Sequence, residues 1–178
     1  RYGLAARDLA RRDGFPWDDL LPVYERWEAV GTVRRGYFVA GLGGLQYALP
    51  EAVERLRLPA EEGMPGYWAV LRCDPANPYG PVLPMPEPAR QADWLVLRRG
   101  EPVLAAGGTR IRLTTLAPLA DEALAAALNE LVRVASWSGR DRLSVVEFDG
   151  QPVQDTRAAE TLQELGFERG YRELVRWA

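Results

Sequence analysis

The segment RRGYF carries the residues of this chain that are best suited to contact a polyanion. Arg34 and Arg35 provide guanidinium groups for phosphate, and Tyr37 provides a ring on which a nucleic-acid base can stack. Arg7 and Arg11 are four residues apart, which places them on one face of a helix. We predict nucleic-acid contacts for six residues: Arg34, Arg35, Tyr37, Arg26, Arg7 and Arg11. The alternative is a solvated hairpin whose arginines pair with nearby acids.

Carboxylates are the remaining side chains that could act as general acids or bases. Five of them stand near the ends of predicted strands: Asp74, Asp93, Glu147, Asp149 and Asp155. Asp74 precedes Pro75 and Asp149 precedes Gly150, as is typical of turns, and Asp155 is placed to cap a helix. The pattern therefore favours structural roles. It identifies no catalytic residue, no cofactor-binding residue and no metal ligand.

Residue types that are missing exclude several kinds of chemistry. The sequence has no histidine, which excludes Ser-His-Asp triads and histidine-ligated zinc. It has no lysine, which excludes a Schiff-base lysine and a P-loop lysine, so a motor ATPase cannot reside in this chain alone. The single cysteine, Cys73, excludes an internal disulfide and fits a reducing, cytoplasmic compartment. We expect Cys73 to be a buried small residue.

Charge and hydropathy place further limits on the partners of the chain. The net charge is −3, which is not typical of a strong nucleic-acid binder. Residues 1–57 hold nine arginines and eight acids, whereas residues 58–178 hold thirteen arginines and seventeen acids. A polyanion would therefore meet the N-terminal part, and weakly. No apolar run reaches the length of a membrane span, so we expect no membrane partner.

The N-terminal part has the order of elements found in a winged helix-turn-helix. We predict helices over 3–14 and 17–31, the second with Pro22 in its first turn, then strands over 33–40 and 45–49 around a glycine turn. A short helix begins at Pro50. This order predicts a winged-helix domain over residues 1–60 that lacks its usual first helix. The second helix carries mostly acids outside, which argues against sequence-specific reading of the major groove.

The remaining residues, 61–178, alternate strands with helices. Strands are predicted over 67–73, 93–99 and 142–150, with hairpin turns at Arg99-Gly100 and Gly107-Gly108. Helices are predicted over 155–166 and over 119–136, the latter with an apolar stripe of Leu124, Leu128, Leu131 and Ala135. Residues 74–88 contain six prolines and read as an extended strap held by its apolar side chains. The fold class is therefore α+β, with a mixed sheet or β-barrel-like module and two inserted helices.

Two motifs in this order and spacing resemble a known family. RRGYFVAGLGGLQYALPEAVERLR, followed about twenty residues later by DPANPYGPVLPMP, is similar to the C-terminal region of Lhr-type proteins, the large helicase-related superfamily 2 DEAD/DEAH-box DNA helicases. The resemblance implies an ATP-dependent DNA translocase linked to DNA repair. ATP and Mg would then bind in motor domains outside this chain, and the chain itself would hold no cofactor.

The same resemblance implies an extension of winged helices and a β-barrel-like module, arranged as in the AlkZ family of DNA glycosylases. Some long members are thought to carry uracil-DNA glycosylase activity there. The AlkZ-type Gln-x-Asp motif is not reproduced, because QPVQD has a different spacing, and the tail YRELVRWA offers only Glu173 as an acid.

Three functions follow as alternatives. The first is a non-motor DNA-binding and assembly module, with single-stranded or forked DNA and the helicase core of the same polypeptide as partners. The second is a glycosylase-type base-excision module, which needs a pocket with a carboxylate and stacking aromatic rings. The third is a purely structural protein-interaction domain. The winged-helix interpretation gives the hairpin a role as the wing, with Arg34 and Arg35 guiding a DNA strand.

Overall fold

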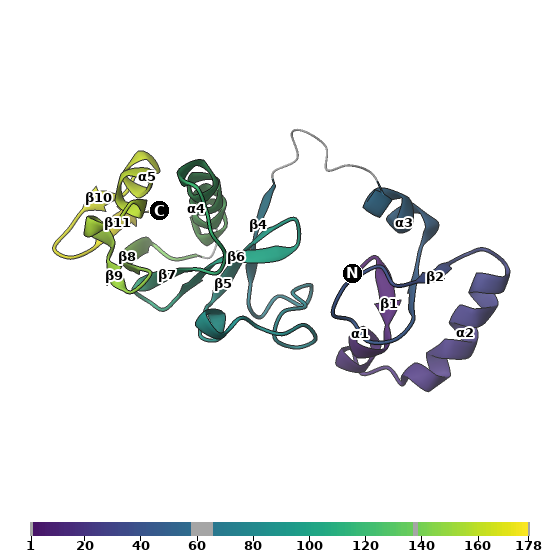
Figure 1. Ribbon diagram of the computed structural model, residues 1–178. Coiled ribbons are helices and arrows are strands. Elements are labelled where there is room, and N and C mark those ends of the chain that lie inside the picture. Colours follow the sequence, from purple (N-terminus) through teal and green to yellow (C-terminus); the bar gives the residue numbers. More distant parts are fainter. Residues whose placement is uncertain (1, 58–65, 137–138, 178) are drawn as a thin grey trace. The chain divides into compact units, whose positions relative to one another are not determined.

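The computed structural model describes residues 2–57, 66–136 and 139–177 of the chain. The chain divides into two compact units. Unit 1 comprises Arg1–Met64 with Pro78–Pro84, and unit 2 comprises Pro65–Asn77 with Met85–Ala178. The elements of both units are labelled in Figure 1. Among the described residues, no helix has the length and apolar character needed to cross a membrane.

Unit 1 combines a small antiparallel sheet with three helices. Its elements in chain order are β1 (Leu4–Ala6), α1 (Arg7–Arg12), α2 (Trp17–Ala29), β2 (Arg34–Gly36), β3 (Gln46–Ala48) and α3 (Pro50–Arg57). The strand order is β1-β3-β2, so that Ala48 of β3 lies between Leu4 and Arg34. This is the strand, helix, helix and hairpin order of a winged helix.

Three predicted elements of unit 1 differ from the structure. The first predicted helix is shorter, because Leu4–Ala6 pairs with β3 as a strand and only Arg7–Arg12 is helical. The two hairpin strands are reduced to three residues each, and residues 37–45 form a loop. Pro22 lies inside α2 and not in its first turn, because the helix already begins at Trp17.

The core of unit 1 is small and includes part of the proline-rich strap. Ala6, Leu9, Leu42 and Leu83 are buried together, and Tyr79 and Val82 pack against them partly buried. Leu83 belongs to the strap, whose backbone turns back through a hydrogen bond from the N–H of Gly80 to the carbonyl of Leu83. Apolar side chains thus hold residues 78–84 on unit 1.

Unit 2 is built on one mixed sheet. Its strands are β4 (Tyr67–Leu71), β5 (Trp94–Arg98), β6 (Glu101–Gly107), β7 (Ile111–Thr115), β8 (Arg142–Phe148), β9 (Gln151–Pro152), β10 (Glu168–Arg169) and β11 (Leu174–Trp177). Its helices are η1 (Glu87–Ala89), α4 (Asp121–Ser136), η2 (Val153–Asp155) and α5 (Ala158–Glu164).

The sheet of unit 2 is open, so the expectation of a β-barrel is wrong and that of a mixed sheet is confirmed. The strand order is β10-β11-β8-β7-β6-β5-β4, with β9 beside β8. Only the β7–β8 pair is parallel, because α4 carries the chain back between these two strands. The strands β4 and β10 lie at opposite ends of this order and do not pair, so the sheet does not close.

The helix α4 completes a large core with this sheet. Its apolar stripe was predicted from the sequence, and Leu124, Leu128, Leu131 and Ala135 are all buried as expected. The helices α4 and α5 contact each other and pack against the sheet (Figure 1). The turn at Arg99-Gly100 is also confirmed, because both residues have positive φ as a tight hairpin between β5 and β6 requires.

Candidate nucleic-acid interface

The two arginines of β2 point toward different helices. Arg34 forms an ion pair of 3.0 Å with Glu54 of α3, and Arg35 forms one of 3.1 Å with Glu28 of α2. Successive residues of a strand face opposite sides of the sheet, which explains the divergence. The two guanidinium groups therefore do not gather on one surface, and each is about half exposed.

The other predicted contact residues are exposed and differ in their surroundings. Tyr37 follows β2 directly and has 77% of its surface accessible. Arg7 and Arg11 lie one turn apart on α1, and Arg26 lies in the last turn of α2. Within the described part of the chain, none of these three arginines forms an ion pair. Together with Arg55 of α3, which is also exposed and forms no ion pair in the described part of the chain, they are the arginines of unit 1 with the least competition for a phosphate.

The glycine-rich loop between β2 and β3 is anchored by Gln46, a residue that the sequence analysis did not single out. Its side chain is fully buried, with 0% of its surface exposed. The amide oxygen accepts hydrogen bonds of 2.9 Å from the N–H groups of Phe38 and Val39, and the amide nitrogen donates to the carbonyls of Val39 and Leu42. One side chain thus satisfies four backbone interactions of the loop.

The same loop also packs against α1. Leu42 is buried beside Leu9, and the N–H of Gly43 donates to the carboxylate of Asp8 at 3.3 Å. Gly41 has φ of +83°, and a Cβ there would lie 3.0 Å from the side chain of Leu83. Because of these contacts the loop folds back on unit 1 and does not project as a free wing.

The helix α2 would be the recognition helix of a winged-helix DNA reader. It carries four acids and one arginine, Arg26. Asp18 and Asp19 lie in its first turn, where the helix dipole favours negative charge. Acids on this helix disfavour approach to phosphates, and the absence of groove reading stays a prediction.

The acidic candidates in unit 2 are engaged in structural contacts. Asp93 accepts a hydrogen bond of 2.9 Å from the N–H of Gly108, and Asp149 accepts two from Thr115, one of 2.7 Å from its N–H and one of 2.8 Å from its hydroxyl. Asp74 accepts from the N–H of Ala76 at 2.7 Å, and Glu147 pairs with Arg112 at 3.6 Å. These interactions fix turns and strand ends.

Two further expectations are wrong. Asp155 does not cap α5, because it lies in the short helix η2 and the residue before α5 is Arg157. Cys73 is exposed, because it falls in the turn after β4 and not within the strand. Among the described residues, no group of three histidine, cysteine, aspartate or glutamate side chains could hold a metal ion.

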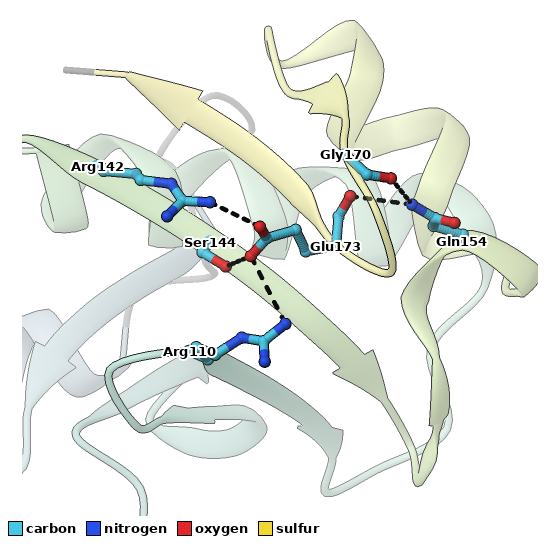
Figure 2. A network of polar contacts seen from close by, with 6 residues as sticks. All are labelled: Arg110, Arg142, Ser144, Gln154, Gly170 and Glu173. Atoms are coloured by element: carbon cyan, nitrogen blue, oxygen red, sulfur yellow. Dashed lines mark hydrogen bonds and ion pairs between the residues drawn. The ribbon is translucent and has the colours of Figure 1, made fainter.

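Glu173, the one acid of the C-terminal tail, is the centre of a polar network shown in Figure 2. Its carboxylate accepts hydrogen bonds from Arg142, at 2.6 Å, and from Ser144, and it lies 3.8 Å from Arg110. The hydrogen bond from Ser144 and the charges of Arg142 and Arg110 lower the pKa of Glu173. The carboxylate is therefore held in its ionised form. This favours a structural role, in which Glu173 links the start of β11 to β8, and disfavours a role as a proton donor.

The main chain beside Glu173 is fixed as well. The amide nitrogen of Gln154 donates to the carbonyl of Glu173 at 3.0 Å and to that of Gly170 at 2.7 Å (Figure 2). These bonds connect η2 to the loop before β11. Both the carboxylate and the backbone carbonyl of Glu173 therefore have hydrogen-bond partners.

Comparison with known proteins gives a match to a protein family and to two relatives. Residues 1–68 match the family described as Large helicase-related protein, winged-helix domain. The chain is 30% identical over 187 residues to a protein of Escherichia coli named Lhr helicase/uracil glycosylase, an alignment that covers 94% of this chain and 12% of that protein.

A second relative comes from Mycolicibacterium smegmatis and is named Lhr helicase/probable uracil glycosylase. The identity is 37% over 109 residues, which is 54% of this chain and 7% of that protein. The chain therefore spans only a small fraction of the length of these two relatives.

Proposed function

Since the chain carries the winged-helix domain of large helicase-related (Lhr) proteins and is homologous to part of the Lhr helicase/uracil glycosylase proteins, we propose that it is an accessory DNA-binding and assembly module of an Lhr-type ATP-dependent DNA helicase. In this role it contacts the backbone of single-stranded or forked DNA and docks on the rest of the polypeptide. The parent protein acts in DNA repair in the cytoplasm.

The proposed DNA contact rests mainly on the exposure and position of Arg7 and Arg11. Both are exposed on α1, one turn apart, and neither forms an ion pair in the described part of the chain. Two guanidinium groups at this spacing on one helix face can bind neighbouring phosphates of one strand. Arg26 of α2 adds a third cation of the same kind.

Arg34 and Arg35 can bind phosphate only if each gives up its ion pair with a carboxylate. Each is held by one exposed or partly exposed carboxylate, and such surface ion pairs contribute about 0–1 kcal/mol. A phosphate can replace Glu54 or Glu28 at little cost, since the arginine exchanges one anion for another. Tyr37, exposed beside them, offers a ring for base stacking.

The proposed binding is weak and independent of sequence. Few phosphates are neutralised, and the acids of α2 lie on the helix that would otherwise read bases. The affinity therefore falls steeply with salt and varies little between DNA sequences.

The motor activity is assigned to other parts of the polypeptide, and unit 2 is not proposed as a site of base excision. The chain has no lysine for a P-loop, so ATP and Mg²⁺ bind in motor domains outside it. Uracil excision appears in the names of the two relatives. However, three described hollows of unit 2 are lined without any aromatic side chain on which a base could stack.

Fluorescence anisotropy of labelled single-stranded and forked DNA tests the proposal. The 178-residue chain is titrated at two salt concentrations beside the double variants Arg7→Ala/Arg11→Ala and Arg34→Ala/Arg35→Ala. We expect salt-sensitive binding that both variants weaken. Absence of binding at low salt would remove the DNA contact from this chain and leave the assembly role alone.

A further inference from the structure

The turn between β10 and β11 contains an arginine whose backbone has a conformation that favours glycine. Arg172 has φ of +81°, in the left-handed region that residues with a Cβ rarely adopt. Among the described residues, the other non-glycine residues with positive φ are Arg99 and Asp149, each of which precedes a glycine in a tight turn between strands. Arg172 precedes Glu173, so glycine-containing turn chemistry does not explain its conformation.

The residues around this turn, 170–173, which we call the hairpin tip, are held in place from two sides. The side-chain amide of Gln154 donates to the carbonyls of Gly170 and Glu173, at the two ends of the tip (Figure 2). The N–H of Gly170 also donates to the carbonyl of Glu173 at 2.9 Å. The Glu173 carboxylate is bound by Arg142 and Ser144 of β8. Backbone strain persists only where such contacts impose it, and it is concentrated at sites that bind ligands.

The hairpin tip presents an aromatic ring together with a guanidinium group. Tyr171 has 86% of its surface accessible, the highest fraction among the large hydrophobic side chains of the described residues. The guanidinium carbon of Arg172 lies 5.4 Å from the centre of the Tyr171 ring, within the range of a cation–π contact. Because the ring is not buried, the contacts that fix the tip place Tyr171 where a ligand can reach it and do not serve the core.

Arginines outnumber acids around the hairpin tip. Arg110 and Arg142 share the single carboxylate of Glu173, and Arg110 is 63% exposed. The strand β10, directly before the tip, adds one acid and one arginine, Arg169. Within the described part of the chain, neither Arg169 nor Arg172 forms an ion pair. Four arginines thus face two acids, which favours a ligand with negative charge.

We propose that the hairpin tip is a second nucleic-acid contact of the chain, in which a base of single-stranded DNA stacks on Tyr171. The phosphates that flank this base bind Arg172 and Arg169. The inference rests on the proposed DNA-binding function and adds a site in unit 2 to the arginines of unit 1. The contact is independent of sequence, because every base has a face that can stack on an aromatic ring.

The combination of ring and charge favours single-stranded DNA over a protein as the ligand. Arg172 lies over one face of the Tyr171 ring, and a base can stack on the other face while its phosphates meet the neighbouring guanidinium groups. An apolar pocket of a protein would also accept the ring. However, it would have to take Arg169 and Arg172 out of water without giving them a partner, which is unfavourable.

Binding of a fluorescein-labelled oligothymidine to the 178-residue chain tests the proposal, with anisotropy measured over a series of salt concentrations. Tyr171→Ala should weaken the affinity by about 5- to 150-fold, which corresponds to about 1–3 kcal/mol of stacking per base. The slope of log affinity against log salt should not change, because the ring carries no charge. Tyr171→Phe, which keeps the ring, should bind as the native chain does. Trp68→Ala, at a tryptophan of β4 that is 54% exposed, is the control and should also bind normally.

Other outcomes overturn the proposal. Equal affinities of Tyr171→Ala and Trp68→Ala would leave the Tyr171 ring to a protein partner. If Arg7→Ala/Arg11→Ala lowers the affinity and the salt slope while Tyr171→Ala changes neither, the hairpin tip is not a contact and the proposed function of unit 1 stands. Absence of binding by the native chain at low salt would remove both. The melting temperature of Tyr171→Ala should equal that of the native chain, so that a loss of affinity does not come from unfolding.

A substitution of the strained arginine gives a second readout, in which stability and binding change in opposite directions. Glycine adopts φ of +81° without strain, so Arg172→Gly should raise the melting temperature by roughly 2–4 °C. The same change should weaken DNA binding and lower the salt slope by about 0.7, because one phosphate contact is lost. A higher melting temperature with unchanged affinity and slope would overturn the phosphate contact of Arg172.

Discussion

The two long helices of the chain, α2 in unit 1 and α4 in unit 2, carry similar apolar stripes but are buried to different extents. The helix α4 has six buried residues and packs on the open sheet, whereas α2 has none. Both sequences follow the same helical period, so the period alone does not say whether a partner is present. The difference shows that α4 closes the core of unit 2, whereas α2 lies at the surface of unit 1 and contacts it mainly through the rings of Trp17 and Tyr24, which pack near Tyr47.

The largest effect should come from shortening a buried side chain of α4. Leu128 is fully buried, and Leu128→Ala should lower the free energy of unfolding by about 2–5 kcal/mol through lost burial and a new cavity. Leu20→Ala on α2 should cost less than about 1 kcal/mol in the 178-residue chain, because Leu20 is already partly exposed. Urea unfolding followed by circular dichroism measures both. Equal losses would mean that α2 is as well packed as α4.

The second effect concerns the loop anchored by Gln46. Gln46→Leu removes the partner of the Phe38 and Val39 N–H groups, and each buried group left unpaired costs about 1–3 kcal/mol. We expect a loss of at least about 2 kcal/mol in unfolding free energy, with faster hydrogen exchange at these two amides. Gln163→Leu on α5, at an exposed position, is the control. Unchanged exchange at Phe38 and Val39 would show that Gln46 does not hold the loop.

A third effect concerns the Glu173 carboxylate of unit 2, and its contribution to stability should depend on pH. The pKa of Glu173 is lowered from its ordinary value of 4.5, so its ionised form stabilises the folded state above that value. The stability difference between the native chain and Glu173→Gln should be constant at neutral pH and shrink as pH falls below about 4.5 through the folded pKa. Its size should be about 1 kcal/mol or less, because the paired arginines are exposed. Melting temperatures between pH 3 and 7 check this. A difference that grows toward low pH would reverse the assignment.

A further small effect on stability should come from the arginines of β2. Arg34→Ala/Arg35→Ala removes two surface ion pairs, each contributing about 0–1 kcal/mol, so the unfolding free energy should fall by less than about 2 kcal/mol. The same variant should bind single-stranded DNA more weakly. Differential scanning calorimetry and anisotropy on one preparation separate the two properties. A large loss of stability with unchanged binding would make these arginines purely structural.

The sequence predicted the elements that depend on local patterns. The stripe of α4 and the Arg99-Gly100 turn were correct, because helical period and turn chemistry are properties of neighbouring residues. The strand Leu4–Ala6 was missed, because three residues carry no clear period and pair only through β3, far along the chain. Whether the sheet of unit 2 closes also depends on its two distant edges, and no local pattern records that.

The surroundings of the candidate interface residues could not be predicted from the sequence, and their nucleic-acid contacts stay a prediction. Tyr37, Arg7 and Arg11 are exposed, whereas Arg34 and Arg35 form ion pairs with two helices at other positions in the sequence. Gln46 was missed, although a polar residue between Leu45 and Tyr47 in an apolar strand was a signal of a buried hydrogen-bonding role.

The most direct test of the account is the salt dependence of single-stranded DNA binding, compared between the two units. The affinity of the 178-residue chain is measured over a series of salt concentrations for the native sequence, for Arg7→Ala/Arg11→Ala in unit 1 and for the charge-matched Arg98→Ala/Arg99→Ala in unit 2. If α1 contacts two phosphates, the slope of log affinity against log salt should fall by about 1.4 in the unit 1 variant and stay unchanged in the unit 2 variant. Equal slopes in all three proteins would contradict a DNA contact on unit 1.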